Sequence, residues 1–311
     1  MKTTIRVAKL NKYQKLIHIN ADNTISAGDA DVAVREPMPA GSSTDAAYVI
    51  NADEFVRACK LSKIVTVENG AINGIPFKDH YDDVASLPPA IQAGHEAIVP
   101  RDALAYIARA MAIKDLRYYL KGVFFDFKAS AIVAIDGHRG HKTAVSHMDQ
   151  APAGGIVPND AIKAALDLSK KAGSVRVIIS DTHFSFPDLG VWGKCADGKF
   201  PDYERVFPAS SARPYETTPM LDISDNLKKL AVFHRVVVID WKTGAGTSGA
   251  LTLPLFHPSV DVPTALQGVE IAYLADAIDA VSCSVRFAER IDSILITRED
   301  GSQAVVMPRR W

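Results

Sequence analysis

The chain has 311 residues, enough for two or three domains that each bury a hydrophobic core. Its net charge of −1 excludes a strongly basic protein that coats nucleic acid, so any contact with nucleic acid must use a local patch. No apolar run has the length of a membrane span or of a signal peptide. We therefore expect a cytoplasmic protein without a membrane partner.

Three cysteines, Cys59, Cys195 and Cys283, lie far apart in the sequence and form no CxxC pair. This spacing predicts free thiols and favours neither a disulfide framework nor a zinc site.

One unit recurs along the chain: a short apolar strand, a polar or proline break, a helix, and then alternating strands. The expected helices span residues 53–61, 101–113, 160–172, 225–233 and 274–283. Three residues are expected as N-caps: Asn51 (with Glu54 completing a capping box), Asn159 and Ser224. In the second helix the apolar stripe is Leu104, Ile107, Ala108 and Met111. Gly173 is expected to close the third helix, and the strand before the fifth is expected at Ile271–Tyr273.

Between the helices the sequence alternates with period two and is rich in β-branched and aromatic residues, which predicts antiparallel strands. The clearest runs are 122–127, 175–179, 235–241 and 303–307. Helix pairs on one face of curved antiparallel sheets give an α+β fold. Connectors at 87–95 and 208–214 predict repeated domains at 1–95, 96–208 and 209–311. Because no helical run precedes Asp53, the first domain is expected to be truncated at its N-terminus and to lack its first helix.

Three stretches resemble the β sliding clamp family, the β subunit of bacterial DNA polymerase III. They are 115–125 together with 134–139, then 197–208, and then 305–311. The resemblance is strong from 96 to 208, clear from 265 to 311, general from 46 to 90 and weak before that. It implies a DNA clamp fold and a non-enzymatic processivity factor without a cofactor, which encircles duplex DNA as a ring. The divergence suggests the hypothesis of a phage or mobile-element origin.

The resemblance also implies a hydrophobic pocket that binds short linear motifs of DNA polymerase, the clamp loader and repair proteins. Carried over residue by residue, it comprises Leu120, Gly137, His138, Arg139, Pro201, Arg205, Val206, Ile294, Val305, Met307, Pro308, Arg309, Arg310 and Trp311. Leu120, Val206, Ile294, Val305 and Met307 would form an apolar slot, with Arg139 and Arg205 as donors at its rim. The alternative is that these residues belong to the cores of two sheets.

Several positions depart from the family pattern. Ile135 stands where threonine is usual, Gly140 where leucine is usual, and Trp311 where a small aliphatic residue is usual. Leu274 and Ala277 are expected at the places of a polar residue and a tyrosine that line the slot. The preferred partner motif is therefore expected to be unusual.

In a clamp the helices would face duplex DNA, and scattered cations would attract its phosphates without sequence preference. The candidates are Arg57, Lys60, Arg109, Lys114, Lys163, Lys170, Lys171, Lys228 and Lys229. The fifth helix carries Asp276 and Asp279 and no lysine. The alternative for each cation is an ordinary solvated helix face.

A head-to-tail homodimer is implied, with the first domain of one copy against the last domain of the other and with 284–289 as an edge strand. The rival interpretation is a clamp-like decoy or adaptor that binds clamp partners without encircling DNA.

Three further patterns favour ordinary structure. Asp136, His138 and His141, and the acidic run Asp79, His80, Asp82 and Asp83, lack the ligand cluster of a metal site. Residues 244–249 match GxGxxG, but a strand-like run follows where a dinucleotide site needs a helix, so we expect a hairpin turn.

Overall fold

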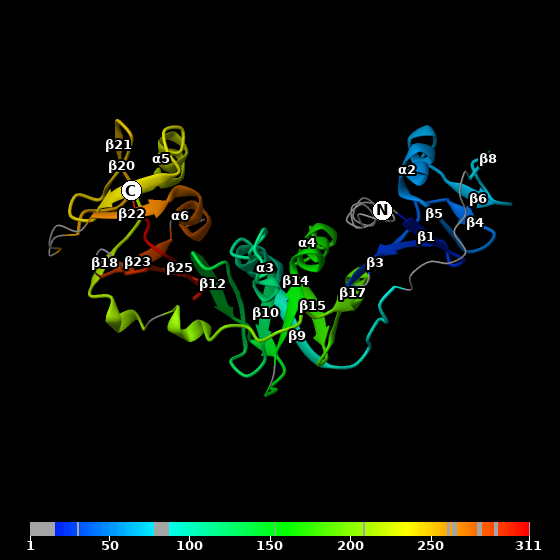
Figure 1. The fold of residues 1–311 in the computed structure, drawn as a ribbon, viewed down its shortest axis with the longest axis horizontal. Coiled ribbons are helices and arrows are strands. Elements are labelled where there is room, and N and C mark those ends of the chain that lie inside the picture. The colour runs from blue at the N-terminus through cyan, green and yellow to red at the C-terminus, as the bar shows by residue number, and fades with distance from the viewer. Residues whose placement is uncertain are drawn as a thin grey trace. The chain divides into compact units, whose positions relative to one another are not determined.

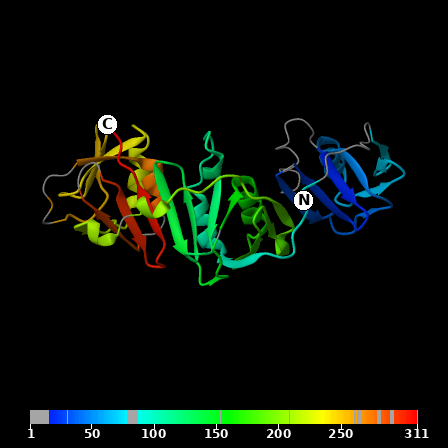
Figure 2. The same ribbon diagram turned by 60° about the horizontal axis from the view of Figure 1, so that its bottom comes forward.

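The computed structural model describes residues 16–29, 31–77, 87–152, 154–207, 209–259, 262, 266–278, 282–288 and 292–310. The chain, drawn in Figures 1 and 2, groups into two compact units. The first consists of 1–104, 124–130 and 145–197, and the second of 105–123, 131–144 and 198–311. The division into three domains stays a prediction. The first domain was expected to lack its first helix. Residues 1–15 of this region lie outside the described residues, so this expectation stays a prediction.

The first unit is built on an antiparallel sheet whose strand order is β13-β9-β15-β16-β17-β3-β2-β1-β5. Their bounds are β1 (Leu16–Asn20), β2 (Thr24–Gly28), β3 (Val32–Pro37), β5 (Tyr48–Asn51), β9 (His95–Pro100), β13 (His147–Met148), β15 (Ser174–Ile179), β16 (His183–Phe186) and β17 (Val191–Lys194). A small sheet runs in the order β4 (Ser43–Thr44), β6 (Thr66–Glu68), β7 (Ala71–Ile72) and β8 (Ile75–Pro76).

Helix α2 (Ala52–Leu61) packs on β1 and β5, and α4 (Asn159–Leu168) packs on β3, β17 and β14 (Gly155–Pro158). Phe55 of α2 is completely buried in a cluster with Ile17, Ile25 and Ile50. A short 3-10 helix, η2 (Pro187–Leu189), joins β16 to β17. Helices α2 and α4 therefore each cover a sheet face within this unit (Figure 1).

In the second unit the strands run in the order β10-β11-β12-β25-β24-β23-β18. Their bounds are β10 (Gly122–Asp126, which continues into the first unit), β11 (Ala131–Ile135), β12 (Arg139–Ala144), β18 (Tyr215–Thr217), β23 (Cys283–Phe287), β24 (Ile294–Arg298) and β25 (Gln303–Val306). A second sheet runs in the order β21 (Leu251–Pro254), β20 (Ala245–Ser248), β19 (Val236–Asp240) and β22 (Leu266–Glu270).

Helix α5 (Ile223–Leu230) packs on β21 and on α6 (Ile271–Ile278), which also contacts β22, β24 and β25. Helix α3 (Arg101–Ala108) begins in the first unit and ends in the second. Short 3-10 helices are η1 (Tyr118–Leu120), η3 (Tyr203–Arg205) and η4 (Ser210–Ala212). The predicted α+β architecture with antiparallel sheets is confirmed.

Several expected helix boundaries were wrong. Helix α3 ends at Ala108 because the chain turns away and the amide of Ala112 donates to the carbonyl of Leu120 at 3.1 Å. Helix α4 already includes Asn159 and ends at Leu168, and α5 begins at Ile223, so neither Asn159 nor Ser224 is an N-cap. Ile271–Tyr273 form the first turn of α6, and the preceding strand is β22.

The cap of α2 was predicted correctly, because Oδ1 of Asn51 accepts a hydrogen bond from the amide of Asp53 at 2.8 Å. The second bond of the capping box, from the Asn51 amide to the Glu54 carboxylate, was predicted wrongly. Oε2 of Glu54 is buried and has no hydrogen-bond partner among the described residues. Within the described part of the chain, no helix is both long and apolar enough to traverse a bilayer.

Candidate functional site

The C-terminal tail of the second unit lies beside strand β12. β12 and β25 pair in antiparallel register, with Arg139 opposite Val306 and Gly140 opposite Val305. The amide of Met307 then donates to the carbonyl oxygen of His138 at 2.8 Å. Two of the three stretches that carry the resemblance therefore meet through backbone hydrogen bonds.

The remaining stretch, residues 197–208, also packs on β12. Nζ of Lys142 lies 3.1 Å from both carboxylate oxygens of Glu204 and 5.0 Å from the centre of the Phe207 ring. A Cβ atom placed on Gly140 would lie 3.2 Å from the Phe207 ring and 2.7 Å from Ile135. A glycine near the start of this strand is thus explained by the close approach of Ile135 and Phe207.

The apolar candidates divide into two groups by burial. Leu120, Ile294 and Val305 are at most 1% exposed and lie in the core. The half-buried candidates, which a ligand can reach, are Pro201, Val206, Met307 and Pro308. Trp311 lies outside the described residues. The accessible apolar surface is therefore narrower than the candidate set.

Arg139 is held in place by three neighbours. Its guanidinium forms ion pairs with Asp136, at 3.2 Å, and with Asp276. It also lies 4.5 Å from the centre of the Tyr273 ring, a cation–π distance. The Tyr273 ring stacks on the exposed His138 imidazole, with centroids 6.2 Å apart. By contrast, Arg205 is 85% exposed and pairs with Asp202 at 3.0 Å.

The sequence prediction missed the residues of α6 that contact this site. Leu274 and Ala277, expected at the slot, are completely buried, and their place at the slot stays a prediction. Tyr273 contacts Arg139, and Glu270, at the end of β22, binds Arg309 through Arg309 Nη1 and Glu270 Oε2 at 2.6 Å. The helix begins earlier than expected, which shifts the exposed positions along α6.

The histidines near β12 do not converge on a metal site. His141 is completely buried, with Nδ1 2.8 Å from the Tyr106 carbonyl oxygen, and burial lowers its pKa to about 3. Oδ1 of Asp136 instead accepts hydrogen bonds from the backbone N–H groups of His138 and Arg139. No cluster of three potential metal ligands occurs in the described ranges, and the acidic run at 79–83 lies outside them.

Residues 244–249, which match GxGxxG, were expected to form a hairpin turn. They instead contain strand β20, which pairs with β21. Gly244, with φ of 74°, and Gly249, with φ of 58°, bound this strand in turns. No helix follows, so the requirement of a dinucleotide site is not met.

Most cations expected to face DNA are solvent-exposed. The exposed ones are Arg57, Lys60, Lys114, Lys170, Lys171, Lys228 and Lys229. Lys163 is half-buried, and Lys228 pairs with Asp225 of its own helix at 2.9 Å. Arg109 lies beyond the end of α3, and Lys170 and Lys171 lie beyond the end of α4, which corrects their placement on helices.

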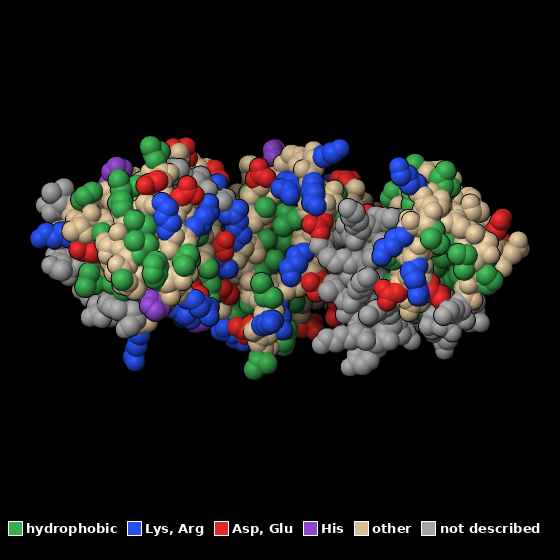
Figure 3. All heavy atoms as spheres, turned by 90° about the horizontal axis from the view of Figure 1, so that it is seen from above, with side chains coloured by type: hydrophobic (Ala, Val, Ile, Leu, Met, Phe, Trp, Pro, Cys, Tyr) green, Lys and Arg blue, Asp and Glu red, His purple; other side chains and the backbone are tan. Residues whose placement is uncertain are grey.

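Arg109 is half-buried, and its Nη1 donates to the carbonyl of Asp276 at 3.4 Å, so it is tied to the protein. Asp279 lies outside the described residues. On the face shown in Figure 3, cations are interspersed with acidic and apolar side chains.

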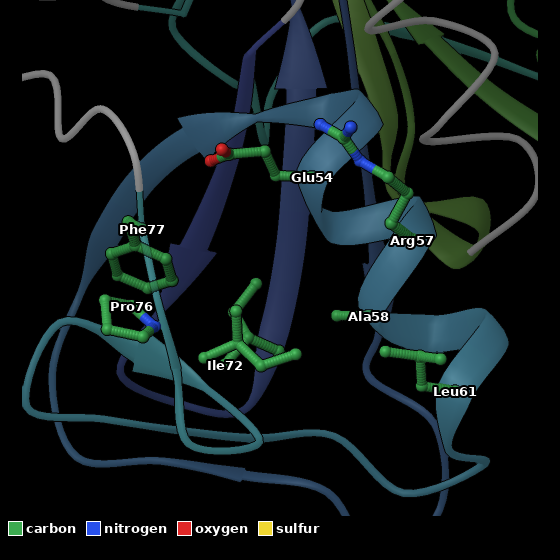
Figure 4. A pocket seen from close by; sticks show the side chains of 8 residues that line it. Glu54, Arg57, Ala58, Leu61, Ile72, Pro76 and Phe77 are labelled. Carbon is green, nitrogen blue, oxygen red and sulfur yellow. The ribbon is translucent and has the colours of Figure 1, made fainter.

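An apolar groove of about 250 Å³ lies on the first unit between α2 and the β7–β8 hairpin (Figure 4). Ile72 is central, Pro76 and Phe77 stand on one side, and Ala58 and Leu61 on the other. Leu61 is 73% exposed and nearby Ile75 is 53% exposed, whereas large apolar side chains are normally more buried.

A second exposed apolar cluster lies on the second unit just after α5. It consists of Val232 and Phe233, which are 80% and 51% exposed, whereas Leu221, 90% exposed, precedes the other end of the helix. The strand expected as an edge, β23, pairs on both sides, with β18 and β24, so this expectation was wrong. Glu289, at the end of that segment, lies outside the described residues.

Comparison with known proteins gives one consistent class. No protein-family model matches the chain. The β sliding clamp of Pseudomonas aeruginosa is 28% identical over 232 residues, which cover 65% of this chain and only 60% of that protein. The β sliding clamp of Pseudomonas putida is 25% identical over 324 residues, covering 94% of this chain and 84% of that protein.

Among solved structures, the Helicobacter pylori β clamp bound to a DNA ligase peptide aligns with a TM-score of 0.75 and 17% identity. The alignment covers 95% of this chain and 92% of that chain. The chain has the fold of the bacterial β sliding clamps and is similar to them in sequence.

Proposed function

We propose that this protein is a DNA sliding clamp: a non-catalytic ring that encircles duplex DNA and tethers DNA polymerase and other replication or repair proteins. The observation that carries the proposal is the meeting of three clamp-like stretches at β12, where Met307 bonds to His138 and Phe207 packs on Gly140. These stretches are distant in sequence, and in a clamp they would build one partner-binding surface.

The partner-binding surface is proposed to take a short peptide with an apolar anchor. Val206, Met307 and Pro308 supply reachable apolar area, and Arg205 and Arg310 are exposed cations beside it. Leu120, Ile294 and Val305 support this surface from the core. The related Helicobacter pylori clamp binds a DNA ligase peptide, which favours the same mode of recognition here.

Ring closure is proposed to join the two exposed apolar clusters of different copies. The groove beside Leu61 and Ile75 on the first unit would receive Val232 and Phe233 from the second unit of a partner copy. A head-to-tail pairing of this kind uses two different surfaces, and it closes as a ring of two copies when the rotation between them is a half turn. Burying these side chains would supply the hydrophobic driving force.

The mechanism is topological. A closed ring stays on DNA without gripping it, so weak contacts from exposed side chains such as Lys60, Lys170 and Lys171 suffice. Their long, flexible stems suit non-specific contact with phosphates, which positions a protein without selecting a sequence.

The proposal is tested first by the mass of the protein in solution, measured by light scattering over a series of concentrations down to the sub-micromolar range. A dimer is expected at the higher concentrations, with dissociation to monomers only on further dilution. A monomer at every concentration would overturn the self-assembled ring and would favour a clamp-like adaptor that binds clamp partners without encircling DNA.

A further inference from the structure

A groove of about 590 Å³ lies between α5 and α6 in the second unit. Its floor includes Leu227 and Ile271, and its polar side chains include Lys228, Arg235 and Glu270. Lys228 is among the predicted DNA-facing residues, whereas Arg235 is not. The groove thus combines an apolar floor with a charged wall.

Glu270 links this groove to the C-terminal tail. Its side chain is only 3% exposed, and Oε1 accepts hydrogen bonds from Nε and Nη2 of Arg235 at 3.0 and 2.7 Å. Oε2 accepts from Nη1 of Arg309 at 2.6 Å. The backbone of Arg309 is also fixed, because its amide donates to the Gly268 carbonyl at 2.7 Å. One buried carboxylate therefore binds two guanidinium groups from different sides.

The charges of this triad do not cancel. Two guanidinium groups and one carboxylate leave a net charge of +1. The excess is presented by Arg235, whose side chain is 82% exposed, compared with 35% for Arg309. A guanidinium carries five N–H donors, so Arg235 keeps donors for a second ligand while two of them hold Glu270.

This arrangement favours a phosphate group as the ligand. The fork of an arginine fixed by a carboxylate matches two phosphate oxygens, and a pre-oriented side chain loses little entropy on binding. Lys228, whose side chain is 77% exposed and pairs with Asp225 at 2.9 Å, is a second cation on the same groove.

We propose that the α5–α6 groove binds a backbone phosphate of nucleic acid through Arg235, and that Glu270 transmits this occupancy to the C-terminal tail. The identification of the phosphate with nucleic acid rests on the proposed function; the anion site itself does not. A bound phosphate neutralises the excess charge and weakens the repulsion between the two guanidinium groups. Arg309 then holds Glu270 more firmly, and the tail at the proposed partner surface becomes more ordered.

The test is hydrogen exchange of the tail, measured by mass spectrometry, with inorganic tripolyphosphate and a short DNA duplex as separate probes. The amides of Met307 and Arg309 report the seating of the tail, because they bind His138 and Gly268. Each probe should slow their exchange about fivefold, a typical size for coupling between two sites.

Arg235→Gln should abolish the slowing, and Arg235→Lys, which keeps the charge without the fork, should restore part of it. Lys242→Gln is the matched control, since it removes one exposed charge from the same unit and should leave the response unchanged. The salt dependence of duplex binding should also become shallower by about 0.9 in Arg235→Gln, the slope contributed by one phosphate contact.

The outcomes separate the two proposals. Slowing by tripolyphosphate alone would keep the anion site and overturn its assignment to nucleic acid. Duplex binding that Arg235→Gln leaves unchanged would overturn the site while the clamp function stands. Slowing that persists in Glu270→Gln would overturn the link to the tail, and binding of neither probe would overturn both proposals.

Discussion

Acidification is expected to destabilise the second unit through His141, a completely buried histidine. Its Nδ1–H donates to the Tyr106 carbonyl oxygen at 2.8 Å, while Nε2 is buried and has no partner among the described residues. Burial lowers the pKa of the imidazole from 6.5 to about 3, and the neighbouring guanidinium groups act in the same direction. A proton on this ring would therefore place an uncompensated charge in the core.

The direction of the change in folding stability with pH follows from the lowered pKa of His141. Above about pH 6.5 the ring is neutral in both states, so its full contribution to stability is present. As the pH falls towards 3, the unfolded chain binds a proton that the folded unit excludes, and stability is lost. At about pH 5, one and a half units below the unfolded pKa, the loss is about 2 kcal/mol.

Urea unfolding at about pH 7.5 and about pH 5 measures this loss. The fluorescence of the buried Trp241 reports the second unit when Trp192 and Trp311 are replaced by phenylalanine. His141→Gln, whose amide can still donate to Tyr106 but does not titrate, is the control. The parent should lose about 2 kcal/mol more than the variant on acidification. Equal losses in the two proteins would refute this reasoning.

Three further substitutions test the structure. Gly140→Leu, which introduces the residue usual in the resembled family, should cost about 1 to 3 kcal/mol in urea unfolding, because its side chain collides with the Phe207 ring. Adding Phe207→Leu should recover part of this loss, and an undiminished loss would contradict the compensation. Gln267→Leu should cost about 1 to 3 kcal/mol, because it removes the acceptor of the buried Trp241 Nε1–H; an unchanged unfolding midpoint would argue against this bond. Phe233→Asp should convert the proposed dimer to monomer in light scattering, whereas an unchanged mass would exclude this cluster from the interface.

Features of the fold that depend on neighbouring residues could be predicted from the sequence. The cap at Asn51 is such a case, because its acceptor and the amide of Asp53 are two residues apart. The start of α6 could not be placed in the same way. Ile271 and the preceding Val269 are both apolar and fully or almost fully buried, so hydrophobic pattern alone does not separate the end of a strand from the first turn of a helix.

The contacts that shape the candidate site are long-range and leave no local signal. Arg139 and Asp276 are 137 residues apart in the sequence. The glycine at position 140, where leucine is usual in the family, is explained only by packing against Phe207, which the sequence does not show. The resemblance named Arg139 and Arg309 as ligands of a partner, whereas the structure also gives each an internal carboxylate. Such pairing is decided by packing between elements, which a single sequence does not display.

Retention on circular DNA tests the central claim most directly. The protein, diluted to monomers and then concentrated with nicked circular DNA, should form rings around it without a loader. High salt removes electrostatic binding but not a threaded ring, so the protein should remain on the circle and be released once the DNA is cut to a linear form. Equal release from the circle and from linear DNA in high salt would contradict an encircling clamp.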